Sequence, residues 1–175
     1  VPGAWLPNKL NELSSALGVR LIGSYIEGMI GIGSTKPLKE PLNPKVDKGV
    51  LCRVPNMDVY TLGAKAMGFR PITIPYSDVY QSMQTGVCDA VDGYPVAAAY
   101  TILGDVLKYW YHTNYSMEYL AIMVSEKSWK KLSAEDQKVF MDVAKKYTLL
   151  SIDNAKAEDN KYMDLMQKKG IKVFK

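Results

Sequence analysis

The chain has 175 residues, of which 47% are apolar and 23% charged. This composition is ordinary for a globular protein, and the length allows one sizeable core or parts of two small domains. The net charge of +4 is mild and the lysines form no basic stripe interleaved with aromatic residues, so no nucleic-acid partner is expected, and no apolar run approaches the length needed to cross a bilayer.

The N-terminal quarter of the chain predicts one helix and one strand. Its first residues, VPGAWLPNKL, lack the basic and apolar regions of a secretory signal, so we expect either a cytoplasmic protein or an exported one whose leader has been removed. Residues 8–17 predict a short helix that Gly18 ends, and residues 19–25 predict a buried strand. Residues 26–49 are rich in Gly, Pro and Lys without a sustained period, which indicates a loop or crossover.

Short apolar strands then alternate with amphipathic helices. The predicted strands are 50–54, 71–75 and 87–91, and the predicted helices are 58–68, 77–86 and a stretch near 95–105. Asp58 and Ser77 suit helix starts, and Gly68 and Gly86 suit helix ends. Strands that alternate with helices through short loops indicate parallel βαβ units, with helices on both faces of a sheet.

The C-terminal third predicts one strand at 120–125, a short helix in 125–132 and one long helix. Ser133 opens the long helix as a capping-box variant, and the 36 residues from Ala134 to Lys169 contain neither Gly nor Pro. A helix of that length measures roughly 54 Å, so we expect it to bridge two lobes. Residues 170–174 predict a further strand, and we expect that both ends of the sequence cut through structure.

Polar and aromatic side chains stand at or just after three consecutive strand ends. Arg53 lies at the first, Tyr76 follows the second, and Asp92, Gly93 and Tyr94 form a predicted turn after the third. Because ligands of open parallel sheets bind beyond the carboxyl ends of the strands, we expect these residues to share one rim.

The guanidinium of Arg53 needs an anion. Its planar fork suits a carboxylate, and a buried guanidinium without any counter-charge would be costly. The residues alone leave two sources of that anion open: a ligand, or an internal partner such as Asp58, Asp89 or Asp92.

Other candidate motifs carry no chemistry. GMIGIGS at 28–34 lacks both the glycine order and the Lys-Ser/Thr ending of a phosphate loop. His112 is the only histidine and no nucleophile elbow accompanies it, so we expect a polar interior or surface residue. Cys52 and Cys88 lie in apolar runs without metal or redox spacing, which favours unpaired core cysteines and leaves a disulfide open. We therefore predict no catalytic residue, metal or cofactor.

Several segments together resemble a known family. They are Arg53–Asn56, Met67-Gly68, Ile74–Tyr80, Gln84–Asp89 and Lys131–Gln137. With the long helix they make nearly the whole chain similar to the DctP-type solute-binding proteins of tripartite ATP-independent periplasmic (TRAP) transporters. The resemblance implies an α/β fold of the type II periplasmic-binding-protein kind, with mixed, mostly parallel sheets in two lobes and a long helix across both.

The same resemblance implies how the chain divides. Residues 1–29 and 119–158, with most of the long helix, would form part of the first lobe, and residues 30–118 and 159–175 the second. It also implies a fragment that lacks the first part of the N-terminal lobe and the extreme C-terminus.

The resemblance assigns roles to residues of the rim. Arg53 stands where the family carries the arginine that clamps the ligand carboxylate, Asn56 matches a position that can contact ligand, and Tyr76 replaces an aromatic residue that lines the cleft. The complete predicted ligand-binding set is Arg53, Asn56, Tyr76, Asp92, Gly93, Tyr94 and Asn114.

Two departures from the family pattern narrow the predicted ligand. Residues 28–31 carry no basic residue where many sialic-acid and dicarboxylate binders have a second arginine. Residues 89–94 lack the Asn that follows the acidic residue of the family's turn. We therefore expect a monocarboxylate with a partly apolar or aromatic body.

The implied activity is capture rather than catalysis. An extracytoplasmic, periplasmic protein whose signal peptide has been removed would dock an organic acid on Arg53, close its lobes and deliver the ligand to TRAP permease subunits, with only indirect membrane association. Two other classes stay open: a ligand-sensing effector domain of a regulator, although no helix-turn-helix is visible, and a small α/β enzyme with Asp92 or Asp89 as general base.

Overall fold

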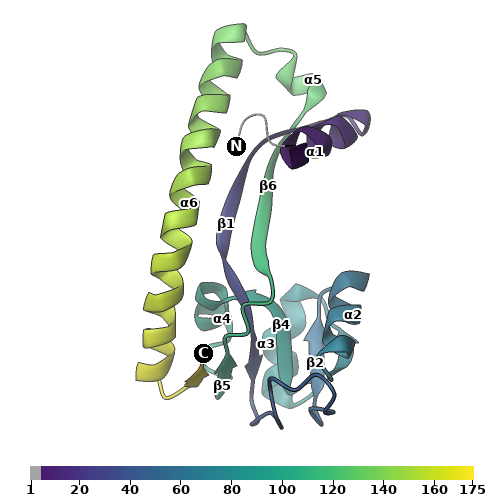
Figure 1. Cartoon of the computed structure of the whole chain (residues 1–175), viewed down its shortest axis with the longest axis vertical. Helices are drawn as coiled ribbons and strands as arrows, with labels where there is room; N and C mark the ends of the chain where they lie inside the picture. Colours follow the sequence, from purple (N-terminus) through teal and green to yellow (C-terminus); the bar gives the residue numbers. More distant parts are fainter. Residues whose placement is uncertain (1–4) are drawn as a thin grey trace. The chain divides into compact units, whose positions relative to one another are not determined.

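The computed structural model describes residues 5–175, and contacts within it divide the chain into two units (Figure 1). Unit 1 consists of the residues up to Glu27 and of Tyr119–Ala155, and unit 2 consists of Gly28–Glu118 and Lys156–Lys175. Three elements contribute residues to both units: β1 (Val19–Ser34), β6 (Met117–Ser125) and α6 (Ala134–Lys168).

Unit 1 contains α1 (Trp5–Ala16), α5 (Glu126–Trp129) and the part of β1 that pairs with β6. Serine side chains cap two of its helices at the start. Ser125 Oγ accepts a hydrogen bond from the Ser128 N–H at 3.0 Å, and Ser133 Oγ accepts one from the Asp136 N–H at 3.1 Å. The predicted capping box at Ser133 is therefore confirmed, and α6 ends within one residue of its predicted end.

Hydroxyl groups of α6 bond the backbone of β1 within unit 1. Thr148 Oγ1 accepts from the Ser24 N–H at 3.0 Å and donates to the Ser24 carbonyl at 2.8 Å. Ser151 Oγ accepts from the Ile26 N–H at 3.0 Å. Gly23 allows this approach, since a Cβ there would lie 3.0 Å from a side chain of α6. The helix thus satisfies strand groups that would otherwise lack a partner.

The sheet of unit 2 is mixed, with strand order β3-β2-β4-β1-β5-β7. β2 is parallel to β3 and β4, and β5 is parallel to β7, whereas β1 is antiparallel to β4 and β5. The bounds of these strands are β2 (Leu51–Val54), β3 (Arg70–Thr73), β4 (Ala90–Pro95), β5 (Tyr109–Tyr111) and β7 (Lys172–Phe174). The predicted mixed α/β fold is confirmed.

Helices and apolar clusters cover both faces of this sheet. The helices are α2 (Asp58–Ala66), the short 3₁₀ helix η1 (Tyr76–Asp78), α3 (Val79–Thr85) and α4 (Val96–Leu103) (Figure 1). One cluster includes Val79, Tyr94, Leu103, Trp110 and Met166, and the other includes Ile32, Cys52, Val54, Ala64 and Phe69. Neighbouring residues of one strand enter different clusters, as the alternation of side chains along a strand requires.

Two predictions about these strands are wrong, and one strand was not predicted. Residues 26–34 continue β1 instead of starting a loop, because Gly31 and Gly33 leave room for the side chains of Trp110 and Leu107. The predicted turn at 92–94 lies inside β4, and β5 was not predicted at all. Glycine reads as a turn signal in sequence, but within a sheet it also permits close approach of a large side chain.

Two glycine substitutions test this packing. Gly31→Ala is expected to lower the free energy of unfolding by about 1–3 kcal/mol, because the added Cβ would meet the Trp110 ring. Gly63→Ala is the matched control, since no heavy atom lies within 4 Å of a Cβ there, and it is expected to raise the free energy of unfolding by about 0.5–1 kcal/mol within α2. Urea unfolding measures both, and equal effects would contradict the assigned contact.

Candidate functional site

Arg53 is buried in the middle of a three-stranded parallel segment. It lies on β2 opposite Ile72 of β3 and Val91 of β4, and only 3% of its surface is exposed. Its Nε donates to the carbonyl of Ile74 at 2.9 Å, and its Nη1 donates to the carbonyl of Asp92 at 3.4 Å. One main-chain oxygen just after β3 and one within β4 therefore hold the guanidinium in place.

No carboxylate of residues 5–175 forms an ion pair with Arg53 within 4.0 Å. Of the three internal partners considered from sequence, Asp89 pairs instead with Lys36 at 2.9 Å. Asp58 opens α2, and the Asp92 carboxylate bonds other groups. The other two arginines do have acidic partners: Arg20 pairs with Glu126 at 3.0 Å, and Arg70 lies 3.9 Å from Asp47.

Asp92 sits beside Arg53 at an irregularity of β4. The register with β1 shifts between Gly31 and Gly33, so that Asp92 and Gly93 together lie opposite one residue. Gly93 has φ +84°, and a Cβ there would lie 2.9 Å from Pro55 Cγ. The glycine therefore lets β4 bulge against the loop that follows Arg53.

The carboxylate of Asp92 is 1% exposed and only partly hydrogen-bonded. Oδ1 accepts from the Gly93 N–H at 2.6 Å and from the hydroxyl of Tyr115. Oδ2 is buried without a partner among the described residues. Burial raises the pKa of Asp92, and the bonds from Tyr115 and Gly93 and the charge of Arg53 oppose that rise.

Tyr76 and Tyr94 form an aromatic stack beside the guanidinium. Their ring centroids are 5.2 Å apart with planes at 18°, and Arg53 Cζ lies 5.6 Å from the centre of the Tyr94 ring. Tyr94 is buried, whereas Tyr76 on η1 is 57% exposed. Burial raises the pKa of Tyr94 to about 12, so its hydroxyl stays neutral at physiological pH.

The two predicted asparagines are exposed. Asn56 lies in the turn between β2 and α2, three residues after Arg53. Asn114 lies between β5 and β6 with φ +52°, directly before Tyr115. Tyr115 was missed from sequence although it bonds Asp92, because nothing in the pattern predicted β5 or the direction of the segment after it. Adjacency to Asn114 was the one available signal.

Comparison with known protein families matches residues 4–175 to the bacterial extracellular solute-binding proteins of family 7, also called DctP. The chain belongs to this family. A relative from Haemophilus influenzae without an assigned function is 27% identical over 171 residues, which are 97% of this chain and 51% of the relative. The chain spans about half the length of the curated relatives it matches.

Solved structures of similar proteins agree with this assignment. The TRAP periplasmic solute-binding protein of Escherichia fergusonii, in an apo open form, is 28% identical with a TM-score of 0.83, over 98% of this chain and 58% of that one. A TRAP solute-binding protein of Haemophilus influenzae with bound L-gulonate is 26% identical with a TM-score of 0.86, over 98% and 56%. The resemblance found in the sequence is thereby confirmed, and the family description agrees with an extracytoplasmic location.

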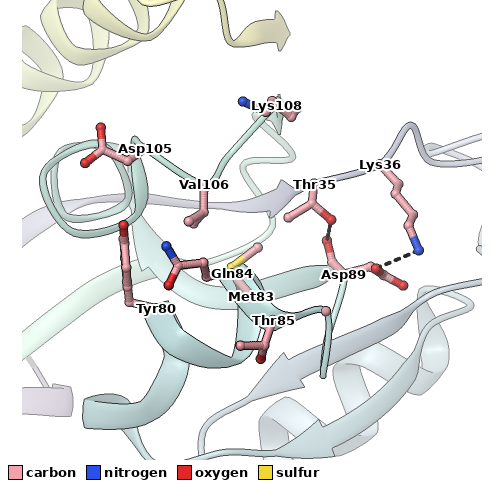
Figure 2. A pocket seen from close by; sticks show the side chains of 11 residues that line it. Thr35, Lys36, Tyr80, Met83, Gln84, Thr85, Asp89, Asp105, Val106 and Lys108 are labelled. Carbon is pink, nitrogen blue, oxygen red and sulfur yellow. Dashed lines mark hydrogen bonds and ion pairs between the residues drawn. The ribbon is translucent and has the colours of Figure 1, made fainter.

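A pocket of about 620 Å³ in this member of family 7 has a lining that does not include Arg53 (Figure 2). Thr35 follows β1, Asp89 precedes β4 and Lys108 precedes β5, and these residues line it. Because β1 is antiparallel to β4 and β5, this edge of the sheet is opposite to the carboxyl ends of β2, β3 and β4. Figure 2 shows the Lys36–Asp89 ion pair at this edge, and no residue of the predicted ligand-binding set lines the pocket.

The cysteines and the histidine are the remaining candidate groups of this family member. Cys52 and Cys88 are buried free thiols, which confirms the expected unpaired cysteines. His112 is half-buried, and burial lowers its pKa. Residues 5–175 contain no group of three or more metal-ligating side chains, and among them no helix is long and apolar enough to cross a membrane.

The buried carboxylate of Asp92 predicts a pH-dependent stability. Because its pKa is raised in the folded state, the unfolded chain releases this proton at a lower pH, and the protein loses stability as pH rises through the folded pKa. Asp92→Asn cannot ionise, so it is expected to melt at a higher temperature than the wild type at pH 7 when no ligand is added. That advantage is expected to shrink toward pH 3.

Thermal melts of both proteins from pH 3 to pH 8 measure this difference. Asp153→Asn, which removes an exposed carboxylate, controls for the change in net charge. An advantage of Asp92→Asn that grows toward acid pH would show that the folded protein favours the ionised carboxylate, contrary to the burial argument.

Proposed function

We propose that this chain is the ligand-capturing part of a TRAP transporter solute-binding protein, which takes up a small organic acid through Arg53. The observation that carries the proposal is a buried guanidinium without a carboxylate within 4.0 Å among residues 5–175. The two bonds to main-chain carbonyls hold Arg53 in place but do not neutralise it. A ligand carboxylate supplies the missing charge.

The position of Arg53 supports its role as a clamp. It stands at the carboxyl ends of parallel strands, where open α/β sheets place their ligands. Its Nε and Nη1 are oriented by the carbonyl just after β3 and by one within β4, so the geometry of the fork is fixed before any ligand arrives. A preorganised donor loses less side-chain entropy on binding than a flexible lysine would.

The surroundings of Arg53 favour a monocarboxylate with a partly apolar or aromatic body. Arg53 is the only arginine at this rim, since Arg20 lies in unit 1 and Arg70 lies at the start of β3. The Tyr76–Tyr94 stack offers an aromatic face next to the charge. The L-gulonate in one similar structure is also a single carboxylate, although its body is polar. Asn56, Gly93 and Asn114 complete the proposed contact set.

The proposed partners follow from the family. The protein works outside the cytoplasm, where it binds the ligand and passes it to the membrane permease subunits of a TRAP transporter. It needs no cofactor, because binding and release involve no bond-making.

Arg53→Met is expected to weaken binding of the cognate acid at least about tenfold. A hydrogen bond to a charged group contributes about 1.5–3 kcal/mol, and the substitution removes both the charge and the fork. Isothermal titration of the full-length protein with acids found by a thermal-shift panel measures the change in Kd.

Arg70→Met is the matched control for this experiment. The side chain of Arg70 is 57% exposed, and it lies on β3 at the end away from the rim. This variant is expected to bind with unchanged affinity. Unchanged affinity in Arg53→Met, or an equal loss in both variants, would show that Arg53 does not clamp the ligand.

A further inference from the structure

One carboxylate oxygen of Asp92, Oδ2, is buried without a hydrogen-bond donor among the described residues, and the proposed capture by Arg53 does not explain it. Oδ2 has lost contact with water and gained no hydrogen bond from residues 5–175. An ionised oxygen in that condition destabilises the protein, since burial is costly unless a donor compensates it. Arg53 approaches the Asp92 backbone carbonyl at 3.4 Å but forms no ion pair with the carboxylate.

The two hydrogen bonds of Asp92 keep its Oδ1 an acceptor. Both partners of Oδ1 are donors, the Gly93 N–H and the Tyr115 hydroxyl. The other titratable groups that act on this carboxylate are Arg53 and Cys52 on β2, Tyr60 on α2 and Tyr115 after β5. Of these only Arg53 is a cation, and it favours the ionised form. A carboxylate with a free oxygen beside an arginine is suited to accept one more donor.

We propose that Asp92 determines specificity by accepting a hydrogen bond from a hydroxyl or ammonium group that lies next to the ligand's carboxylate. This assignment rests on the proposed capture by Arg53. The carboxylate of Asp92 belongs to the same residue whose carbonyl bonds Arg53, which is consistent with a ligand that carries its anion and its donor on neighbouring atoms. The ligand class is therefore a 2-hydroxy or 2-amino monocarboxylate, in preference to the unsubstituted acid.

In the proposal, the ligand reaches Oδ2 past Tyr115, whose hydroxyl bonds the other oxygen of Asp92, Oδ1. The Tyr115 side chain is 42% exposed and belongs to the connection between β5 and β6, where Asn114 has a positive φ. Its hydroxyl donates a hydrogen bond to Asp92, and rotation of the Tyr115 side chain would break that bond. In the proposal the donor of the ligand compensates Oδ2, while the Gly93 N–H keeps its bond to Oδ1.

Asp92→Asn gives a directed test, because the hydrogen bonds fix the orientation of the new amide. The Gly93 N–H and the Tyr115 hydroxyl both need an acceptor at the position of Oδ1, so the amide oxygen takes that place. The amide NH₂ then occupies the position of Oδ2. The substitution therefore replaces an acceptor by a donor at one atom and keeps the shape of the side chain.

Four acids with one carbon skeleton probe that atom: 4-methylpentanoate, 2-hydroxy-4-methylpentanoate, leucine and 4-methyl-2-oxopentanoate. With the full-length wild type, isothermal titration is expected to show the hydroxy acid or leucine binding at least about tenfold more tightly than 4-methylpentanoate. Which of the two is preferred identifies the donor as hydroxyl or ammonium. With Asp92→Asn a preference for leucine is expected to disappear, because an ammonium cannot accept from the amide NH₂, whereas the hydroxy acid can still accept and keeps part of its affinity. The oxo acid, which carries only an acceptor, is expected to gain affinity.

The outcomes separate this inference from the proposed function. If 4-methylpentanoate binds, loses affinity in Arg53→Met, and is not surpassed by the hydroxy acid or leucine, capture by Arg53 stands and the role of Asp92 is wrong. A wild type that prefers the oxo acid would also overturn the role, because Asp92 would then be donating a proton. Failure of all four acids to bind would overturn the ligand class. The wild-type comparison can overturn the inference even if Asp92→Asn does not fold.

Discussion

The burial of the Arg53 guanidinium is the constraint on which the arrangement of unit 2 depends. A charge with 3% of its surface exposed needs acceptors, and here they are the carbonyls of Ile74 and Asp92. Those carbonyls reach it only because β2 lies between β3 and β4 with all three strands parallel. The burial of Arg53 at this position therefore depends on both the order and the direction of these strands.

The glycines of β1, which pairs with β4 on the side away from β2, also shape the surroundings of Arg53. Gly31 and Gly33 admit the side chains of Trp110 and Leu107 against the strand, which lets β1 lie between β4 and β5. At the same place the register of β1 and β4 shifts, and Asp92 and Gly93 bulge toward the Arg53 loop. The small residues of β1 thus allow the close packing that surrounds the bulge bearing Asp92.

The parts of this fold that have local causes could be predicted from the sequence. The alternation of strands and helices from 50 to 105 and the long helix after Ser133 follow from periodicity, caps and the lack of Gly or Pro, all of which act within a few residues. The errors have non-local causes. The glycines of 28–34 mimic a loop unless Trp110 is known to pack on them, and Asp92-Gly93 mimics a turn unless β1 is known to pair there.

The residues of the candidate site also separate into those with local causes, which could be predicted, and one with a non-local cause, which could not. The proximity of Arg53, Tyr76, Tyr94 and Asp92 could be predicted, because the carboxyl ends of parallel strands meet at one edge. Tyr115 could not, because its contact with Asp92 depends on the segment after an unpredicted strand. That Arg53, Tyr76, Tyr94 and Asp92 bind a ligand stays a prediction, since the position of a side chain alone does not identify what it binds.

Two aspartates three residues apart show how strand direction decides the role of a carboxylate. Asp89 precedes β4 and therefore lies at the edge where the antiparallel β1 ends, within 2.9 Å of Lys36. Asp92 lies further along β4, beside the arginine rim, with no lysine or arginine in ion-pair contact among the described residues. The first carboxylate forms an ion pair within the protein and the second does not. Within residues 5–175 the rim therefore holds one cation without an ion-paired carboxylate and one carboxylate oxygen without a hydrogen-bond donor. Under the proposed role of Asp92, a ligand that carries an anion and a donor side by side would bond both groups, whereas a simple carboxylate would bond Arg53 and leave Oδ2 buried without a donor.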